Sequence, residues 1–321
     1  MENSQNTSKK SLREVASVVE LIDTPFTFDD VMEAYEQSNI EFENTGYKLS
    51  EADLVTIKGD VPRTMYYVKN VEKRDFYREM LTKILTSMEL KYIQGMAMIS
   101  GVVLYYYTSD EVDKLFKGKK FEKNVKNNEA MNTTSAINLN QGIKISDVLT
   151  KDLKKKIVKV LTEIFHSKFL PLTDNKFEKY RKLNKVFLEL VKKHKKIVID
   201  ESFSMTYMNQ TLSFFVNEFD EMEDKYFILS MILATPNNVL FIILFLLYDS
   251  IKNKKTINID QKNFFKKIIE VESDFLKTQS SLSYSKKPHP LRIFLTTLGV
   301  TIFVGVVGVG AGMILQNYKN E

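Results

Sequence analysis

Two short stretches contain the residue types that phosphoryl-transfer chemistry requires. Residues 57–63 read Ile-Lys-Gly-Asp-Val-Pro-Arg, and residues 92–95 read Tyr-Ile-Gln-Gly. A guanidinium such as that of Arg63 is always charged and planar, so it can contact two phosphate oxygens at once. An amide such as that of Gln94 can accept a hydrogen bond from an attacking water and donate one to a phosphate oxygen. The pair could therefore stabilise a phosphoryl-transfer transition state without any shifted pKa.

Each stretch also has a purely structural interpretation. The first could be a surface turn with a solvated arginine, and the second a helix junction that Gly95 interrupts. Pro62 disfavours helix at Val61, so we expect Arg63 near a loop-to-helix junction, where its side chain can project. Apolar residues at helical spacing predict a buried helix that connects the two stretches. These residues are Tyr77, Met80, Leu81, Ile84, Leu85 and Met88.

In this order and at this separation, the two stretches resemble the I-x-x-D-x-x-R and Y-x-Q-G motifs of the TBC domain. That family comprises GTPase-activating proteins for Rab GTPases. A third region, residues 212–248, is similar to the C-terminal half of TBC domains, especially those of tail-anchored members of the early secretory pathway. The resemblance covers roughly residues 19–259. It implies an all-α fold, a multi-helix TBC domain.

The resemblance implies a role for each residue of the two motifs. Arg63 would be an arginine finger supplied in trans, and Gln94 would orient the attacking water in place of the glutamine of the GTPase. Asp60 would hold Arg63 through a charge-assisted hydrogen bond, while Tyr92 and Gly95 would shape the backbone around Gln94. The partner would be a GTP-bound Rab GTPase, which carries the GTP and Mg²⁺. The chain itself would hold no cofactor or metal, and would be a GTPase activator without a catalytic activity of its own.

The sequence departs from the family pattern in two places. It contains no Trp, whereas many members carry an R-x-x-x-W motif before the arginine motif. Met96, Ala97 and Met98 follow the second motif, where members often have a polar residue. These changes keep open an alternative, a catalytically weak membrane-anchored scaffold that binds a Rab. A third interpretation, a tail-anchored tether, requires sustained heptads near the membrane, which residues 268–284 do not supply.

The C-terminal region predicts a membrane anchor. Residues 293–317 contain no charged side chain and are mostly apolar, and about 20 such residues span a bilayer core. Four basic or titratable residues, Lys286, Lys287, His289 and Arg292, precede this run, and only Lys319 follows it. The positive-inside rule then places the long N-terminal part in the cytosol. We predict a single transmembrane tail anchor over residues 291–315, in the endoplasmic reticulum or early secretory pathway; the alternative is a buried C-terminal helix.

The glycines of this run allow a further interpretation. Gly308 and Gly312 have the small-xxx-small spacing that permits close packing of membrane helices, and hence a homodimer. Glycine is also simply common in membrane helices. A second uncharged run, residues 226–248, is broken around Pro236, so we expect a buried helix pair there rather than a second span.

The remaining sequence suggests a plan for the chain. Residues 1–18 are polar and expected to be disordered, and Thr27 is a candidate N-cap for the first helix of the domain. Residues 109–145 are rich in Lys, Asn and Thr and predict a surface insertion. Residues 260–290 would then form a juxtamembrane segment between the TBC domain of residues 19–259 and the anchor.

Composition excludes several classes of protein. The net charge of +5 is too modest to indicate nucleic-acid binding. The chain has no Cys, and its three His residues are far apart, so a disulfide framework is excluded and a metal site is not expected. No glycine-rich phosphate loop is present, which indicates that the chain does not bind GTP by itself.

Overall fold

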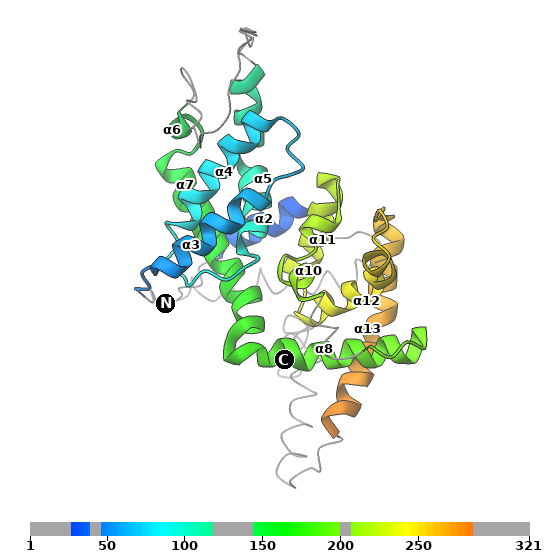
Figure 1. Cartoon of the computed structure of the whole chain (residues 1–321). Helices are drawn as coiled ribbons and strands as arrows, with labels where there is room; N and C mark the ends of the chain where they lie inside the picture. Colours follow the sequence, from blue (N-terminus) through cyan, green and yellow to red (C-terminus); the bar gives the residue numbers. More distant parts are fainter. Residues whose placement is uncertain (1–26, 39–45, 118–143, 200–206, 285–321) are drawn as a thin grey trace, which may run out of the picture. The chain divides into compact units, whose positions relative to one another are not determined.

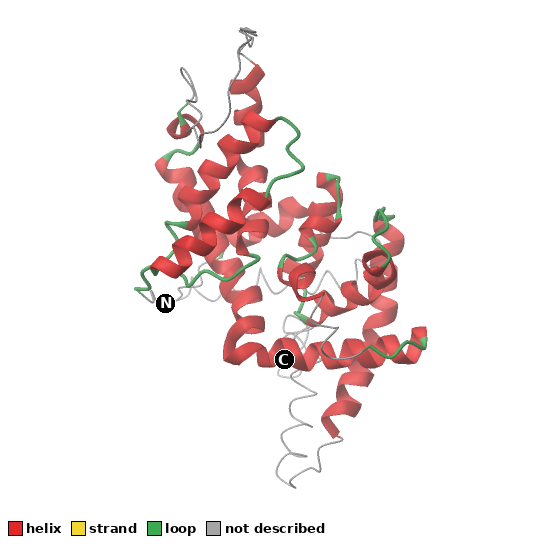
Figure 2. Cartoon of the chain, in the orientation of Figure 1, coloured by secondary structure: helices red, strands yellow, loops and turns green. Residues whose placement is uncertain are grey.

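The computed structural model describes residues 27–38, 46–117, 144–199 and 207–284. Within these ranges the chain is helical and contains no strand, as Figure 2 shows. This confirms the all-α prediction. The chain divides into two compact units, one of Met1–Ile40 with Glu163–Glu321 and one of Glu41–Thr162.

The unit Glu41–Thr162 contains both motifs. Its helix α4 packs against both α3 and α5 (Figure 1). All six apolar residues predicted to form the connecting helix face are buried, although Met88 lies just beyond the end of α4. The elements of this unit are α3 (Glu51–Asp60), the 3₁₀ turn η1 (Val61–Arg63), α4 (Val71–Leu85), α5 (Met96–Lys117), α6 (Ile145–Val148) and most of α7 (Lys151–Ile164).

Two expectations for this unit need correction. Val61 has helical dihedral angles (φ −55°, ψ −44°) despite the proline after it. The chain tightens there from α-helix into the 3₁₀ turn η1, at whose start Pro62 needs no backbone donor. The expected surface insertion also begins later than residue 109, because α5 continues to Lys117. Residues 118–143 lie outside the described part of the chain.

The second unit is built around buried helices α11 and α12, which form the helix pair predicted for residues 226–248. Thr27 is the N-cap of α2, and its hydroxyl accepts from the Asp30 backbone N–H while the Asp30 side chain accepts from the Thr27 N–H. This confirms the predicted cap. The described elements are α2 (Phe28–Gln37), the π-helical turn η2 (Phe165–Phe169), α8 (Leu170–Lys195), α10 (Met208–Leu212), η4 (Val216–Glu218), α11 (Met222–Ala234), α12 (Asn238–Lys252) and α13 (Gln261–Tyr284).

The segment expected to be juxtamembrane is instead part of this unit over most of its length. Helix α13 packs against α8 and α12, and its Ile268 and Phe275 are buried. Residues 285–290 lie outside the described ranges, as do residues 1–18. Ile268 and Phe275 of this segment therefore contribute to the core of the unit, whereas Ile269 is exposed.

The predicted C-terminal transmembrane helix is not shown. In the described residues, no helix is long and apolar enough to cross a membrane. The predicted anchor, residues 291–315, lies outside the described ranges, together with the Gly308 and Gly312 spacing. The fold class is therefore corrected to all-α, without the transmembrane helix that the run of uncharged residues suggested.

Candidate functional site

Helix α3 carries the first motif and has a well-defined start. Ser50 is its N-cap, with the hydroxyl accepting from the Asp53 N–H at 3.1 Å, while the Asp53 carboxylate accepts from the Ser50 N–H at 2.9 Å. Tyr47 donates a further hydrogen bond to Asp53 at 2.7 Å. Burial would raise the pKa of Asp53, but the hydrogen bonds from Ser50, Tyr47 and the Tyr92 backbone outweigh it and lower the pKa. The start of α3 is thereby fixed.

The end of α3 joins the two motifs. The Tyr92 hydroxyl donates to Oδ2 of buried Asp60 at 2.9 Å. The other carboxylate oxygen, Oδ1, lies 3.9 Å from Nη1 of Arg63, which is an ion-pair distance rather than that of the expected hydrogen bond. The Arg63 side chain is 68% exposed, so most of its donors face away from the protein. Asp60 therefore contacts the guanidinium of Arg63 at ion-pair distance only, and most of the Arg63 side chain stays exposed.

Tyr92 connects to both ends of α3. Its hydroxyl donates to Asp60 at the end of the helix, and its backbone lies close enough to Asp53, near the start of the helix, to lower the pKa of that carboxyl. Burial, followed by the charge of Asp60, raises the pKa of the Tyr92 hydroxyl, which therefore remains a hydrogen-bond donor at any physiological pH. Tyr92 thus fixes the second motif along the length of the helix that carries the first.

The second motif forms a tight turn that exposes Gln94. The Met96 N–H donates to the Ile93 carbonyl at 3.1 Å, and Gly95 has φ of 106°. A positive φ at this third position of a turn requires glycine or costs strain, which explains Gly95. Gln94 is exposed, and α5 begins directly after the turn. Of the three residues that depart from the family pattern, Met96 and Ala97 are buried in the core of the unit, and Met98 is half-buried.

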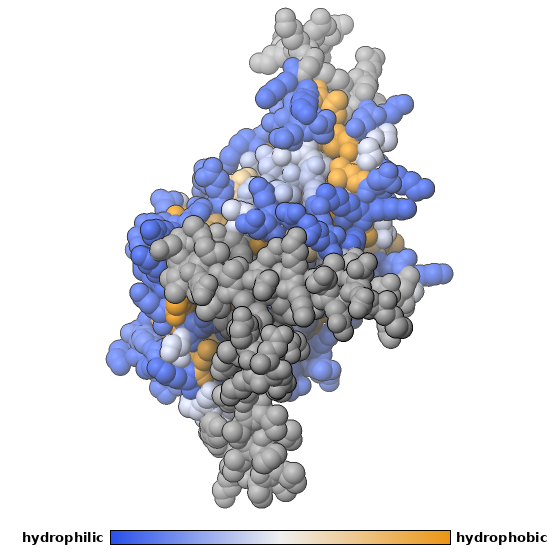
Figure 3. Space-filling model, turned by 180° about the vertical axis from the view of Figure 1, so that it is seen from behind, coloured by the Kyte–Doolittle hydropathy of each residue, from blue (hydrophilic) through white to orange (hydrophobic). Residues whose placement is uncertain are grey.

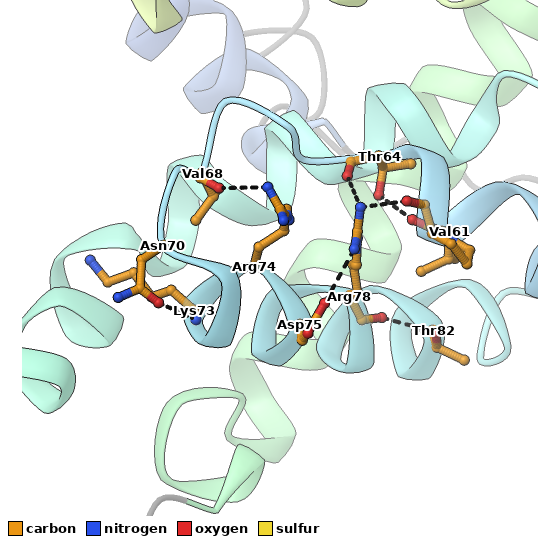
Figure 4. Close-up of polar contacts among 10 residues, drawn as sticks. Val61, Thr64, Val68, Asn70, Lys73, Arg74, Asp75, Arg78 and Thr82 are labelled. Carbon is orange, nitrogen blue, oxygen red and sulfur yellow. Dashed lines mark hydrogen bonds and ion pairs between the residues drawn. The ribbon is translucent and has the colours of Figure 1, made fainter. Parts of the chain in front are cut away.

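Arg78 braces the turn that presents Arg63, and sequence patterns did not reveal it. From α4, its Nη2 donates to the Pro62 carbonyl and, at 3.1 Å, to the Thr64 carbonyl (Figure 4). Its Nη1 pairs with Asp75 at 3.2 Å. The Pro62 and Thr64 carbonyls belong to the residues directly before and after Arg63 in the chain. The only sequence signal is an arginine beside the buried face of α4, which does not say which backbone it would hold.

The loop after Arg63 also contacts the helix that follows Gln94. Met65 has φ of 63°, a left-handed conformation unusual for its residue type, and its side chain is buried. Gly101 of α5 is the close neighbour: a Cβ placed there would lie 3.5 Å from Met65 Cγ. The strained loop is thus held by packing onto α5 and by the Arg78 hydrogen bonds.

Both candidate side chains are presented by turns of the same unit. One exposed guanidinium and one exposed amide are carried by adjacent rigid elements whose connecting residues are buried and hydrogen-bonded. No cluster of metal-ligating side chains occurs in the described residues. The site could stabilise charge on a phosphoryl group that another molecule brings, because neither side chain is held by a closed network.

Comparison with known proteins gives one informative match. The chain is 28% identical over 298 residues to an uncharacterized membrane protein of Encephalitozoon cuniculi, an alignment that covers 87% of this chain and 96% of the relative. No protein-family model and no solved structure matches the chain. The relative is thus named as a membrane protein, and the comparisons are silent on GTPase activation.

Proposed function

We propose that this chain is a GTPase-activating protein that stimulates GTP hydrolysis on a Rab-family GTPase, as a TBC domain would. Arg63 reaches the β and γ phosphate oxygens of the partner's GTP and neutralises the charge that develops there. Gln94 orients the attacking water. An arginine supplied in trans accelerates this reaction about 10³–10⁵-fold, which corresponds to about 4–7 kcal/mol of barrier.

The contact between Asp60 and Tyr92 carries this proposal. It joins two motifs that lie 32 residues apart in the chain, through a buried hydrogen bond of 2.9 Å. The carboxylate that accepts this bond also pairs with Arg63, and Tyr92 precedes Gln94 by two residues. A chance surface turn and an unrelated helix junction would have no reason to share one buried carboxylate.

The altered residues after Gly95 support activity rather than a scaffold alone. Met96 and Ala97 are buried, so they pack inside the unit and are not placed to reshape an exposed groove, and Met98 is half-buried. The two side chains with proposed chemical roles are both exposed. A chain that bound a GTP-loaded Rab but stimulated no hydrolysis would nevertheless be a scaffold, and the experiment below separates the two.

The experiment is single-turnover hydrolysis with a panel of purified Rab GTPases loaded with GTP. We expect wild-type protein to stimulate at least one of them by about 10³-fold or more, and Arg63→Ala to bind that GTPase without stimulating it. Glu51→Gln, an exposed change at the start of the same helix, is the control. Binding without stimulation by the wild-type protein would identify a scaffold.

We further propose that the protein works at a membrane, with the early secretory pathway as its address. The support is the printed name of the Encephalitozoon cuniculi relative and the family branch that the sequence resembles. Fractionation of cells that express the full chain tests this. High-salt and alkaline extraction then separate a peripherally bound protein from an integral one, and recovery in the soluble fraction without extraction contradicts the proposal.

A further inference from the structure

Exposed large hydrophobic side chains gather in the sequence around Arg63. Among the described residues six such side chains are exposed, and four of them fall within residues 54–71. On the face shown in Figure 3 the described surface is mainly hydrophilic, with hydrophobic residues in a few areas only. Exposed apolar residues that gather in one region indicate an interaction surface. The six are Leu54, Val55, Tyr66, Val71, Val198 and Ile269.

Helical geometry places part of this group beside Arg63. Val55, Gly59 and Arg63 are spaced four residues apart on α3 and the 3₁₀ turn that continues it, so they follow one side of a helix. Four residues of helix advance about 6 Å. A protein that brings a phosphate to the Arg63 guanidinium must therefore come close to Gly59.

Gly59 has no role that the chain itself explains. It lies inside α3, its φ is not positive, and a Cβ added there would meet nothing within 4 Å. Glycine inside a helix is destabilising relative to alanine because it restricts the unfolded chain less. Gly59 therefore lowers stability without making room for any other part of the chain. The absence of a side chain there would allow the backbone of another molecule to approach closely.

Tyr66 is the second part of this surface. Its ring is 58% exposed, yet Arg74 and Arg78 lie over it, with guanidinium carbons 5.8 and 5.4 Å from the ring centre. Arg78 also holds the carbonyls that flank Arg63, so the ring and the catalytic turn share one support. Tyrosine is favoured at the centres of interfaces, and a ring fixed in advance loses little entropy on binding.

We infer that Val55, Gly59 and Tyr66 form the surface on which the GTP-bound GTPase docks, with Tyr66 as a fixed aromatic contact and Gly59 as the point of closest approach. This rests on the proposed function, because the occupant is identified by its need to reach Arg63. These residues act on binding, and Arg63 and Gln94 act on the rate.

The test measures kcat and KM of stimulated hydrolysis with the full chain and the GTP-loaded Rab that it stimulates most. We expect Tyr66→Ala to raise KM about 10-fold or more and to leave kcat within about twofold. Tyr66→Phe should retain the wild-type KM, because the ring rather than the hydroxyl makes the contact. Val198→Ala, an exposed apolar change in the other unit, is the control for lost hydrophobic surface.

Gly59→Ala gives an independent readout in which stability and binding move in opposite directions. The melting temperature should rise by about 1–4 °C, while KM rises about fivefold or more because the added methyl group prevents close approach. Ser280→Ala, an exposed position in α13, controls for helix stabilisation alone. If Tyr66→Ala does not fold, Gly59→Ala decides the question by itself.

The possible outcomes are distinct. An unchanged KM in both Tyr66→Ala and Gly59→Ala overturns the docking surface and leaves the proposed function intact. A loss of kcat at constant KM in Tyr66→Ala also overturns it, since the ring would then only position Arg63. A wild-type chain that stimulates no GTPase overturns the proposed function and the docking surface together.

Discussion

Two short turns, one in each unit, are built in the same way and put to different use. In the unit Glu41–Thr162, η1 is followed by Met65 at positive φ, and Arg78 of the next helix donates to two carbonyls of the turn. In the other unit, Phe214 and Phe215 have positive φ before η4. Lys225 of the next helix donates there to the Val216 and Phe219 carbonyls.

The difference lies in what each turn presents. The turn at η4 directs phenylalanines inward, and its bracing lysine is only 3% exposed. The turn at η1 directs Arg63 outward, with a single ion pair at 3.9 Å. A strained turn fixed by a cation from the next helix is therefore not itself a functional signal. The signal is a second, exposed cation whose donors the protein leaves available.

The largest expected effect removes that exposed cation. Arg63→Lys should lower stimulated hydrolysis about 10³–10⁵-fold, because an ammonium cannot contact two oxygens in the fixed geometry of a guanidinium. The melting temperature should stay within about 2 °C of wild type, since an exposed ion pair contributes little. The measurements are single-turnover hydrolysis and thermal unfolding. Substantial activity in Arg63→Lys would refute the finger assignment.

The next effect concerns Gln94. A GTPase whose own catalytic glutamine is replaced should still be stimulated, because Gln94 supplies the amide. Gln94→Ala should then reduce stimulation about 10²-fold or more, the scale of single transition-state groups. The measurement is the single-turnover hydrolysis rate for four pairings, in which this protein is wild type or Gln94→Ala and the GTPase has or lacks its catalytic glutamine. Stimulation that depends only on the glutamine of the GTPase would leave Gln94 without a chemical role.

Removing the two braces compares the turns directly. Lys225→Met should lower the free energy of unfolding by about 2–4 kcal/mol, because two buried carbonyls lose their donor. Arg78→Ala should lower it by about 1–2 kcal/mol, because its carbonyl partners are exposed or part-buried. Only Arg78→Ala should also reduce stimulated hydrolysis, by about 10-fold, since it releases the turn that positions Arg63. Denaturant unfolding and hydrolysis assays below the unfolding transition separate the two effects. Equal loss of stimulated hydrolysis in both variants would show that Arg78 has no specific role in positioning Arg63.

The smallest effect is a pH dependence at the η4 turn. Burial raises the pKa of Glu218, and the charge of Lys225 only partly opposes this. Because the pKa of Glu218 is higher in the folded state, protonated Glu218 favours folding, and this contribution to stability is lost as pH rises through that pKa. Glu218→Gln should therefore gain stability relative to wild type as pH increases from about 4 towards 7. Glu223→Gln, an exposed neighbour, is the control; a difference independent of pH would contradict the assignment.

Much of the fold follows from the sequence because its signals are local. Helical spacing of apolar residues identified the buried face of α4, and an uncharged run broken around Pro236 identified the α11–α12 pair. Thr27 was recognisable as a cap three residues before its partner Asp30. The two candidate chemical residues could likewise be named from short motifs. The transmembrane helix that hydropathy predicts over residues 291–315 lies outside the described residues, among which no helix is long and apolar enough to cross a membrane. A local rule was wrong at Val61, which has helical dihedral angles although Pro62 follows it.

What the sequence by itself determined is the set of helices, their apolar faces and the candidates Arg63 and Gln94. The tertiary structure alone decided that Tyr92 reaches Asp60, that Arg78 holds the turn beside Arg63, and that Gly59 faces open space. The physical reason is that the spacing of hydrophobic residues along a helix indicates which face is buried, and each residue contributes to that pattern through its own side chain. A hydrogen bond between side chains 32 residues apart depends on how helices pack, and no local pattern encodes which carboxylate a buried hydroxyl will meet.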